Sequence, residues 1–248
     1  MTIFKEISTF YNDLYKEKKY HEETKYILSL LDNKPKDILD MGCGTGGHIK
    51  YLNKYKINCL GVDISKEMLK IAKKQNPLSQ FIYSDILKFK SKKKYHCVLS
   101  LFHVASYMQN YKNLEKFFNV AFKNLHEGGN FIFDFWNYDA IKADPPLKRI
   151  KRFKFKNKNL LKVSIPEHIK DSNLVKVKFY FFYENQKKEK ISQNKKIYYE
   201  EHRMLLIKPI KAIKILKKVG FKKIKSFTWL TKRDISQKAW YGCILATK

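Results

Sequence analysis

The stretch ILDMGCGTGGH, residues 38–48, constrains the fold of this chain more than any other part of the sequence. An apolar run ends in Asp40, and a segment with helical character follows at residues 48–52. A strand, a glycine turn and a helix in this order open a nucleotide-type pocket at the carboxyl end of the first strand of an α/β sheet. Glycine suits such a turn because positive φ angles and close approach of a ligand both disfavour larger residues. The turn holds three glycines at alternate positions, Gly42, Gly44 and Gly46.

The glycine spacing separates this turn from two other kinds of phosphate-binding loop. A phosphate loop of the GxxxxGK[ST] type needs a Lys-Ser or Lys-Thr pair, and the stretch contains neither. A dinucleotide loop needs GxGxxG, which Gly42, Gly44 and Gly47 formally satisfy. That pattern alone is weak, so a nicotinamide enzyme stays an alternative on this evidence.

The chain is strongly basic, with 52 Lys and Arg residues against 23 Asp and Glu and a net charge of +29. Such a balance suggests nucleic-acid binding. However, arginine is the side chain best suited to bidentate phosphate and base contacts, and almost all the basic residues here are lysines spread along the sequence. We therefore interpret the charge mainly as solvated surface and expect no nucleic-acid partner, with RNA binding as the alternative.

Cysteine spacing and hydropathy indicate a cytoplasmic protein with reduced thiols. The 4 cysteines show no CxxC spacing, so neither a metal site nor a disulfide framework is expected. No apolar run reaches the roughly 20 residues of a membrane span, and the first residues lack the apolar core of a signal peptide. The sequence leaves the oligomeric state open, with a homodimer as one alternative.

Strands alternate with helices through the first half of the chain. We expect a helical segment over residues 3–32, and later helices at residues 48–55, 65–75 and 110–126. The strand signals are apolar or β-branched runs bounded by turn residues. They lie at residues 37–41, 58–62, 80–83, 95–101 and 130–135.

After residue 137 the pattern changes to period-2 alternation, which predicts an inserted antiparallel meander. The meander strands are expected at residues 160–165, 175–184 and 196–207, before a helix at 209–219 and strands at 222–230 and 239–246. The chain is therefore predicted to divide into an N-terminal helical cap (1–36), an α/β domain in two pieces (37–142 and 208–248), and an inserted β segment (143–207).

Two acids follow predicted strands at positions that suit a nucleoside. Asp63 lies 23 residues after Asp40, and a carboxylate at about that spacing accepts hydrogen bonds from both ribose hydroxyls. The alternative is an acid that only stabilises the next helix through its dipole. Asp85 follows the third strand, where it could accept from an adenine amine while the N–H of Ile86 donates to the ring, or be an ordinary turn residue.

The strings DMGCGTGGH, GVDISKEML, YSDI, VLSLFHVASYM and LHEGGNFIFDFWN, in this order, resemble class I S-adenosylmethionine (SAM) methyltransferases. Within that superfamily the chain is most similar to the sugar methyltransferases of deoxysugar pathways, including N-methyltransferases of nucleotide-linked amino sugars. The resemblance covers roughly residues 8–137 and 205–247. It implies a Rossmann-like sheet of order 3-2-1-4-5-7-6 with the last strand antiparallel, SAM as methyl donor, and the inserted strands as a lid over the substrate.

The resemblance also implies a set of residues around SAM. Glu23 is expected near the methionine ammonium, and the glycine turn and the strand ends are expected around the nucleoside. The expected SAM-binding residues are Tyr20, Glu23, Asp40, Gly42, Gly44, Gly46, Asp63, Ile64, Met68, Asp85, Ile86, Leu101 and Phe102.

The acceptor is expected at the ends of the fourth and fifth strands. His103 and Asp134 are the expected catalytic residues, with His103 acting as a base or only positioning the acceptor. Arg203 is expected to hold a diphosphate, with a plain salt bridge as the alternative. The expected substrate-binding residues are Tyr11, Tyr15, Tyr107, Trp136, Asn137 and Arg203.

The resemblance thus implies methyl transfer from SAM to a small molecule, with a nucleotide-linked amino sugar as the expected acceptor. An RNA or tRNA methyltransferase that uses the basic surface is the alternative. DNA amino-methyltransferases carry an Asn/Asp-Pro-Pro-aromatic motif after the fourth strand. Here the nearest match, residues 144–147, follows the fifth strand and ends in Leu147, so we interpret it as a linker into the lid.

Overall fold

The computed structural model describes residues 7–156, 158–184 and 197–248. Its centre is a seven-stranded sheet of order β10-β11-β5-β4-β1-β2-β3, which confirms the predicted order and the α/β class. Strand β11 runs antiparallel to both of its neighbours, and β1, β2, β3, β4 and β5 are parallel to one another. The strands are β1 (Asp37–Met41), β2 (Asn58–Asp63), β3 (Gln80–Tyr83), β4 (Tyr95–Ser100), β5 (Leu125–Trp136), β10 (Ile224–Thr228) and β11 (Tyr241–Thr247).

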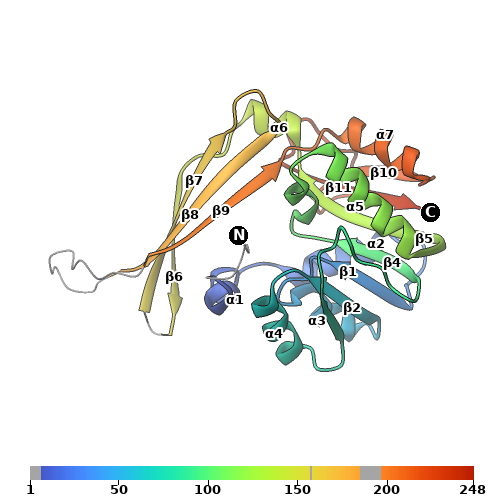
Figure 1. Ribbon diagram of the computed structural model, residues 1–248, viewed down its shortest axis with the longest axis horizontal. Coiled ribbons are helices and arrows are strands. Elements are labelled where there is room, and N and C mark those ends of the chain that lie inside the picture. The colour runs from blue at the N-terminus through green and yellow to red at the C-terminus, as the bar shows by residue number, and fades with distance from the viewer. Residues whose placement is uncertain (1–6, 157, 185–196) are drawn as a thin grey trace.

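Helices cover both faces of this sheet (Figure 1). One apolar cluster joins α2 (Tyr20–Ser29), α3 (Gly47–Lys54) and α4 (Lys66–Gln75) to β1 and β2. Another cluster joins α5 (Tyr111–Asn124) and α7 (Pro209–Val219) to the opposite face. A sheet buried on both sides explains why the central strands are almost continuously apolar.

Capping residues fix where the helices begin and end. The hydroxyl of Ser65 accepts a hydrogen bond from the N–H of Met68, and the side chain of Asn110 accepts one from Asn113, at the starts of α4 and α5. Gly220 ends α7 in the left-handed conformation, with φ of 117°. Each cap satisfies backbone groups that a helix end leaves unpaired.

The inserted segment forms a second, four-stranded antiparallel sheet of order β6-β7-β8-β9, called the lid here. Its long strands extend away from the central sheet and over the N-terminal segment (Figure 1). Phe10 packs against Phe181 of the lid with ring centroids 5.2 Å apart. The lid strands are β6 (Arg149–Phe155), β7 (Lys158–His168), β8 (Leu174–Tyr183) and β9 (Tyr198–Leu205).

The N-terminal part differs from the single helical segment expected over residues 3–32. It consists of a short 3₁₀ turn, η1 (Ser8–Phe10), then α1 (Tyr11–Leu14) and α2, and residues 3–6 lie outside the described residues. A turn over residues 15–17, followed by Lys18 and Lys19, separates α1 from α2. The break follows the charged run at residues 16–19, because that run supplies no apolar face to pack.

Strand β5 begins at Leu125, five residues before its predicted start, so the helix expected to reach residue 126 is shorter. Leu125 is fully buried and pairs with Tyr95, and the register between β4 and β5 shifts just after that pair. Gly128, with φ of 73°, lies within this extension. Gly128 and Gly129, which lie between the predicted helix and the predicted strand, therefore form an irregular part of β5.

Three further elements were not predicted: β6, α6 (Tyr138–Ala143) and the 3₁₀ turn η2 (Val104–Met108). All three are short or rich in charge, so their hydrophobic periodicity is weak. Among the helices that the structure describes, none is both long and apolar enough to cross a membrane.

Candidate active site

The glycine turn after β1 forms one wall of the candidate site. Gly42 has φ of 86°, and a Cβ there would lie 2.6 Å from Cγ2 of Val104, so the turn packs directly against η2. Gly44 has φ of 53°, and a Cβ there would meet no described atom within 4 Å. The backbone at Gly44 therefore faces open space, as a turn that receives a ligand requires.

A cavity of about 370 Å³ lies at the carboxyl ends of β1, β2 and β4. This is the edge at which open α/β sheets bind their ligands, and the volume is within the usual range for small-molecule sites. Most of the residues expected around SAM line it. The cavity is lined by Tyr11, Gly42, Gly44, Asp63, Ile64, Met68, Asp85, Ile86, Leu87, Leu101, Phe102, Val104, Tyr107, Met108, Gln109 and Asn113.

Asp63 lies at the end of β2 and is held by the backbone on both carboxylate oxygens. Oδ2 accepts from the N–H of Gly44 and Oδ1 from the N–H of Ser65, both at 2.8 Å. Burial raises the pKa of Asp63 above its ordinary value, although hydrogen bonds from the backbone oppose this. The two backbone N–H groups thus orient the carboxylate before any ligand binds, and Asp63 lines the cavity.

Asp40 lies behind the glycine turn and is completely enclosed. Its Oδ2 has no hydrogen-bond partner among the described residues. Burial raises the pKa of Asp40 to about 6; His48 opposes this shift and Asp63 adds to it. A buried carboxylate oxygen without a donor is costly, so Asp40 supports the turn at a cost in stability and does not line the cavity.

Tyr20 and Glu23 hold the N-terminal segment against the glycine turn and do not line this cavity. The carboxylate of Glu23 is 2.7 Å from Nε2 of His48 and pairs also with Lys18. Burial alone would raise the pKa of Glu23, but His48 and Lys18 lower it more. A Cβ on Gly47 would lie 2.5 Å from the ring of Tyr20. The two oxygens of Glu23 thus have protein partners, which argues against direct contact with a ligand ammonium.

Gly46 is also placed behind the cavity wall. A Cβ there would lie 2.6 Å from Nδ2 of Asn76, so this glycine allows α3 and α4 to approach each other. Together with Asp40, Tyr20 and Glu23, it supports the site from behind instead of forming its surface.

A second, smaller cavity of about 190 Å³ adjoins the first and lies beneath the lid. Phe102 and Tyr107 line both cavities and form the wall between them. Tyr15, His103 and Trp136, all expected at the acceptor, are found here. The second cavity is lined by Ile7, Tyr15, Phe102, His103, Tyr107, Trp136, Lys162, Val177, Phe179, His202, Met204 and Tyr241.

His103 follows β4 in an unusual backbone conformation. Phe102 and His103 have φ of 65° and 64°, and consecutive left-handed residues other than glycine are typical of functional sites. The N–H of His103 donates to Oδ1 of Asp134 at 2.9 Å, and its ring stacks on Tyr241 with centroids 4.6 Å apart.

The side chains of His103 and Asp134 form an ion pair, with Nδ1 and Oδ2 2.8 Å apart. The angles are not those of an aligned hydrogen bond, so the buried Nδ1 of His103 has an ion-pair partner but no hydrogen bond among the described residues. Burial would raise the pKa of Asp134, but His103 and, more weakly, Lys18 lower it below its ordinary value. The two expected catalytic residues are therefore coupled, and His103 is the one that reaches the cavity.

Two residues expected to bind the substrate, Asn137 and Arg203, line neither cavity. Asn137 is buried, and its Nδ2 donates to the carbonyl oxygens of Ser236 and Ala239, so it holds the loop before β11. The side chain of Arg203 is 53% exposed, and its Nε donates to Glu201 at 3.0 Å. Because alternate residues of a strand face opposite ways and His202 faces the second cavity, Arg203 lies on the outer face of the lid.

Several residues that line the second cavity were not expected at the site. Lys162 on β7 has its Nζ 4.0 Å from the ring centroid of Phe179. Burial lowers the pKa of Lys162 to about 8; Lys151 adds to this shift and Glu200 opposes it. His202 and Tyr241 lie on β9 and β11. Period-2 alternation places each of these on one face, but it does not say which face is inward.

Comparison with known proteins places the chain in a family. The model of a methyltransferase domain matches residues 38–129. An uncharacterised protein of Methanocaldococcus jannaschii is 32% identical over 189 residues, which cover 73% of this chain and 70% of that protein. The chain belongs to the class I SAM-dependent methyltransferases. It is therefore an enzyme, and its methyl donor is SAM.

Relatives of this methyltransferase include a sugar-modifying enzyme. The dTDP-3-amino-3,4,6-trideoxy-alpha-D-glucopyranose N,N-dimethyltransferase of Streptomyces venezuelae is 26% identical over 130 residues. The matched part covers 51% of this chain and 55% of that enzyme. The chain thus matches little more than half the length of this relative.

Solved structures share the whole fold of the methyltransferase. A SAM-dependent methyltransferase from Clostridium acetobutylicum superposes with a TM-score of 0.79 at 20% identity, covering 99% of both chains. The sugar N-methyltransferase KedS8 from a Streptoalloteichus species gives a TM-score of 0.80 at 14% identity, covering 95% of this chain and 90% of that one. At such identities the likeness shows the fold, including the lid, and not the acceptor.

Proposed function

We propose that this methyltransferase transfers the methyl group of SAM to the amino group of a nucleotide-linked deoxysugar. The second cavity is the main support for this proposal. It adjoins the first cavity at Phe102 and Tyr107 and is lined by both aromatic and ionisable side chains. Its volume of about 190 Å³ is below the roughly 300–1,000 Å³ of sites that enclose a whole drug-sized ligand. A cavity of this volume therefore suits one sugar ring, with the nucleotide outside it.

The first cavity would hold SAM through the ends of three strands. Asp63 would accept from the ribose hydroxyls, because its carboxylate is already oriented by two backbone N–H groups. Asp85 and Ile86 would contact the adenine, and Oδ1 of Asp85 is fixed by the N–H of Leu87 at 2.9 Å. SAM supplies a methyl group activated by a positively charged sulfur.

The second cavity would align the acceptor nitrogen with that methyl group. Orientation of two reacting groups can itself supply about 7–11 kcal/mol of a barrier. His103, fixed by Asp134 and by stacking on Tyr241, would contact the reacting sugar, and Tyr15 and Trp136 would enclose the ring. The left-handed backbone at His103 explains how a residue just past β4 turns toward the acceptor.

A basic hollow between α1 and β6 would bind the diphosphate of the substrate, which was first expected to bind to Arg203. Its volume is about 420 Å³, and its acids are Asp13 and Glu17. Tyr15 lines the second cavity while its chain neighbour Lys16 lines the hollow, so the two spaces lie on either side of the end of α1. The basic residues of the hollow are Lys16, Lys151, Arg152, Lys154 and Lys156.

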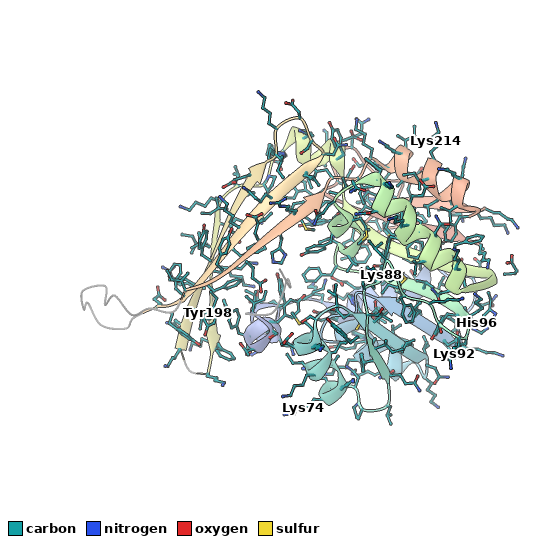
Figure 2. The ribbon with its side chains drawn as sticks, viewed as in Figure 1. Lys74, Lys88, Lys92, His96, Tyr198 and Lys214 are labelled. Carbon is teal, nitrogen blue, oxygen red and sulfur yellow. The ribbon has the colours of Figure 1, made fainter. Side chains whose placement is uncertain are left out.

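The alternative of an RNA methyltransferase gains no support from the relatives named above. The lysines labelled in Figure 2 are exposed and lie apart, on α4 (Lys74), on α7 (Lys214) and in the loop between β3 and β4 (Lys88 and Lys92). Charge distributed in this way gives weak binding to any polyanion, with steep salt dependence. The small volume of the second cavity, about 190 Å³, favours a small acceptor.

An assay of the purified enzyme with SAM and a panel of nucleotide-linked sugars tests the proposal. We expect methylation of one or more amino sugars and none of the matched neutral deoxysugars, as measured by mass spectrometry of the products. A structured tRNA and a free amino sugar without nucleotide serve as competing acceptors. Turnover of the tRNA or of the free sugar alone would refute the nucleotide-linked acceptor.

A further inference from the structure

A chain of three hydrogen-bonded side chains connects the lid to the wall between the cavities. Nδ1 of His202 is 2.7 Å from the hydroxyl of Tyr107, and Nε2 of His202 is 3.1 Å from Oε2 of Glu200. Glu200 and His202 lie two residues apart on β9, so they share one face. Both are buried, with 6% and 3% of their surface exposed.

The chemistry of these groups sets the direction of the hydrogen bonds. A carboxylate can only accept, so Nε2 of a neutral His202 carries the hydrogen that bonds to Glu200. Its Nδ1 then accepts, and Tyr107 donates to it. Burial raises the pKa of Tyr107 well above its ordinary value, so the phenol keeps its proton. Tyrosine, histidine and glutamate are thus ordered like the nucleophile, base and acid of a hydrolase triad.

Tyr107 belongs to the wall that separates the cofactor cavity from the second cavity, and His202 lines the second cavity. We infer that Tyr107, His202 and Glu200 form a proton relay that deprotonates the acceptor nitrogen. This inference rests on the proposed amino-group acceptor. An alkylammonium has no lone pair, so it must lose a proton before it can attack the methyl group.

Each proton that moves in the relay has a named donor and a named acceptor. The acceptor ammonium gives one proton to the oxygen of Tyr107, and Tyr107 gives its own proton to Nδ1 of His202. The products are a neutral amine with a lone pair, an unchanged phenol and an imidazolium beside the carboxylate of Glu200. Oε1 of Glu200 has no hydrogen-bond partner among the described residues, so no donor there weakens the attraction of the carboxylate for His202. After the sugar leaves, the imidazolium releases its proton to solvent.

His103 is less suited to this task than Tyr107. His103 lines only the second cavity and does not reach the first. Its ring is stacked on Tyr241, and its Nδ1 lacks an aligned hydrogen bond to Asp134. These contacts fix the ring, which suits a positioning residue. Tyr107 stands where the methyl group must pass from one cavity to the other.

Other titratable groups face the relay from neighbouring elements. Lys162 approaches from β7, Tyr15 from the end of α1, Tyr241 from β11, and His103 from the loop after β4. Lys162, with its pKa lowered to about 8, would add a transition on the alkaline side of a pH profile. The relay needs a neutral His202, whose Nδ1 accepts the proton of Tyr107.

Three variants test the relay: Tyr107→Phe, His202→Gln and Glu200→Gln. The matched control is Glu201→Gln, one residue along β9 on the outer face, where it pairs with Arg203. We expect kcat to fall by about 100-fold or more in Tyr107→Phe, within the usual range for loss of general-base catalysis. Glu200→Gln should also lower kcat, because the imidazolium loses its carboxylate partner, while Glu201→Gln should match the wild type. A kcat in Tyr107→Phe within about threefold of the wild type would overturn the relay.

A second readout does not depend on the acceptor. In the full-length enzyme bound to S-adenosylhomocysteine, ¹⁵N NMR of the histidine rings should show His202 as the Nε2–H tautomer. Glu201→Gln should leave this tautomer unchanged. An Nδ1–H tautomer of His202 in the wild type would refute the relay. If no sugar in the panel is methylated, the acceptor proposal fails while this measurement still decides the relay.

Discussion

Replacing Asp63 with alanine should weaken SAM binding by about 2–4 kcal/mol, because two hydrogen bonds to a charged acceptor are lost. At about 1.4 kcal/mol for each tenfold change, this is a rise in Kd of roughly 30- to 1,000-fold. The structure supports a value toward the upper end. The carboxylate also holds the N–H groups of Gly44 and Ser65 at 2.8 Å, so the variant loses the arrangement of the turn as well.

Isothermal titration calorimetry with SAM and with S-adenosylhomocysteine measures this effect. Asp63→Asn is the graded variant, since its amide oxygen can still accept one hydrogen bond and should lose less affinity than alanine does. Asp234→Ala, at an exposed position before β11, is the control for removing a carboxylate elsewhere. Circular dichroism shows whether each variant folds. A folded Asp63→Ala protein whose Kd stays within about threefold of the wild type would remove the ribose assignment.

Three further predictions concern the turn, the basic hollow and the buried acid. Gly42→Ala should destabilise the fold by about 1–3 kcal/mol, because a positive φ and a clash with Val104 coincide, and Val104→Ala should partly restore the melting temperature. Lys151→Gln combined with Lys154→Gln should raise KM for a nucleotide-linked sugar with little change in kcat or in SAM affinity. The raised pKa of Asp40, about 6 against 3.8, means that the folded state binds the proton more tightly. Above pH 6 this should cost the SAM-free protein up to about 3 kcal/mol, and the cost should disappear as the pH falls toward 4. Denaturant unfolding of Asp40→Asn, which lacks this pH dependence, measures the difference.

The parts of the site that follow the central strands could be predicted from sequence. Asp63 is the last residue of β2 and Asp85 follows the end of β3 by two residues, and parallel strands bring their carboxyl ends to one edge. The positions that line the first cavity then follow from local spacing. The positions of Tyr20 and Glu23 depend instead on how an N-terminal helix packs on distant residues. Glu23 pairs with His48, and no local sequence pattern indicates that contact.

The residues of the lid could not be placed in the same way. A strand with alternating side chains has two faces, and a choice between them needs the pairing register with its neighbours. Arg203 and His202 are adjacent on β9, and the register puts His202 inward and Arg203 outward. Lys162 is a similar case, because a lysine on a mixed strand suggests solvent until the packing of aromatic residues around it is known.

The lid enters the chain between β5 and α7, yet it carries two of the three relay residues, while Tyr107 belongs to the central domain. A laboratory chimera that receives a relative's lid to change its sugar preference would also exchange Glu200 and His202. Such a chimera could bind both substrates and still turn over slowly. Restoring the two residues on the new lid, in register with Tyr107, would then be the step that recovers the rate.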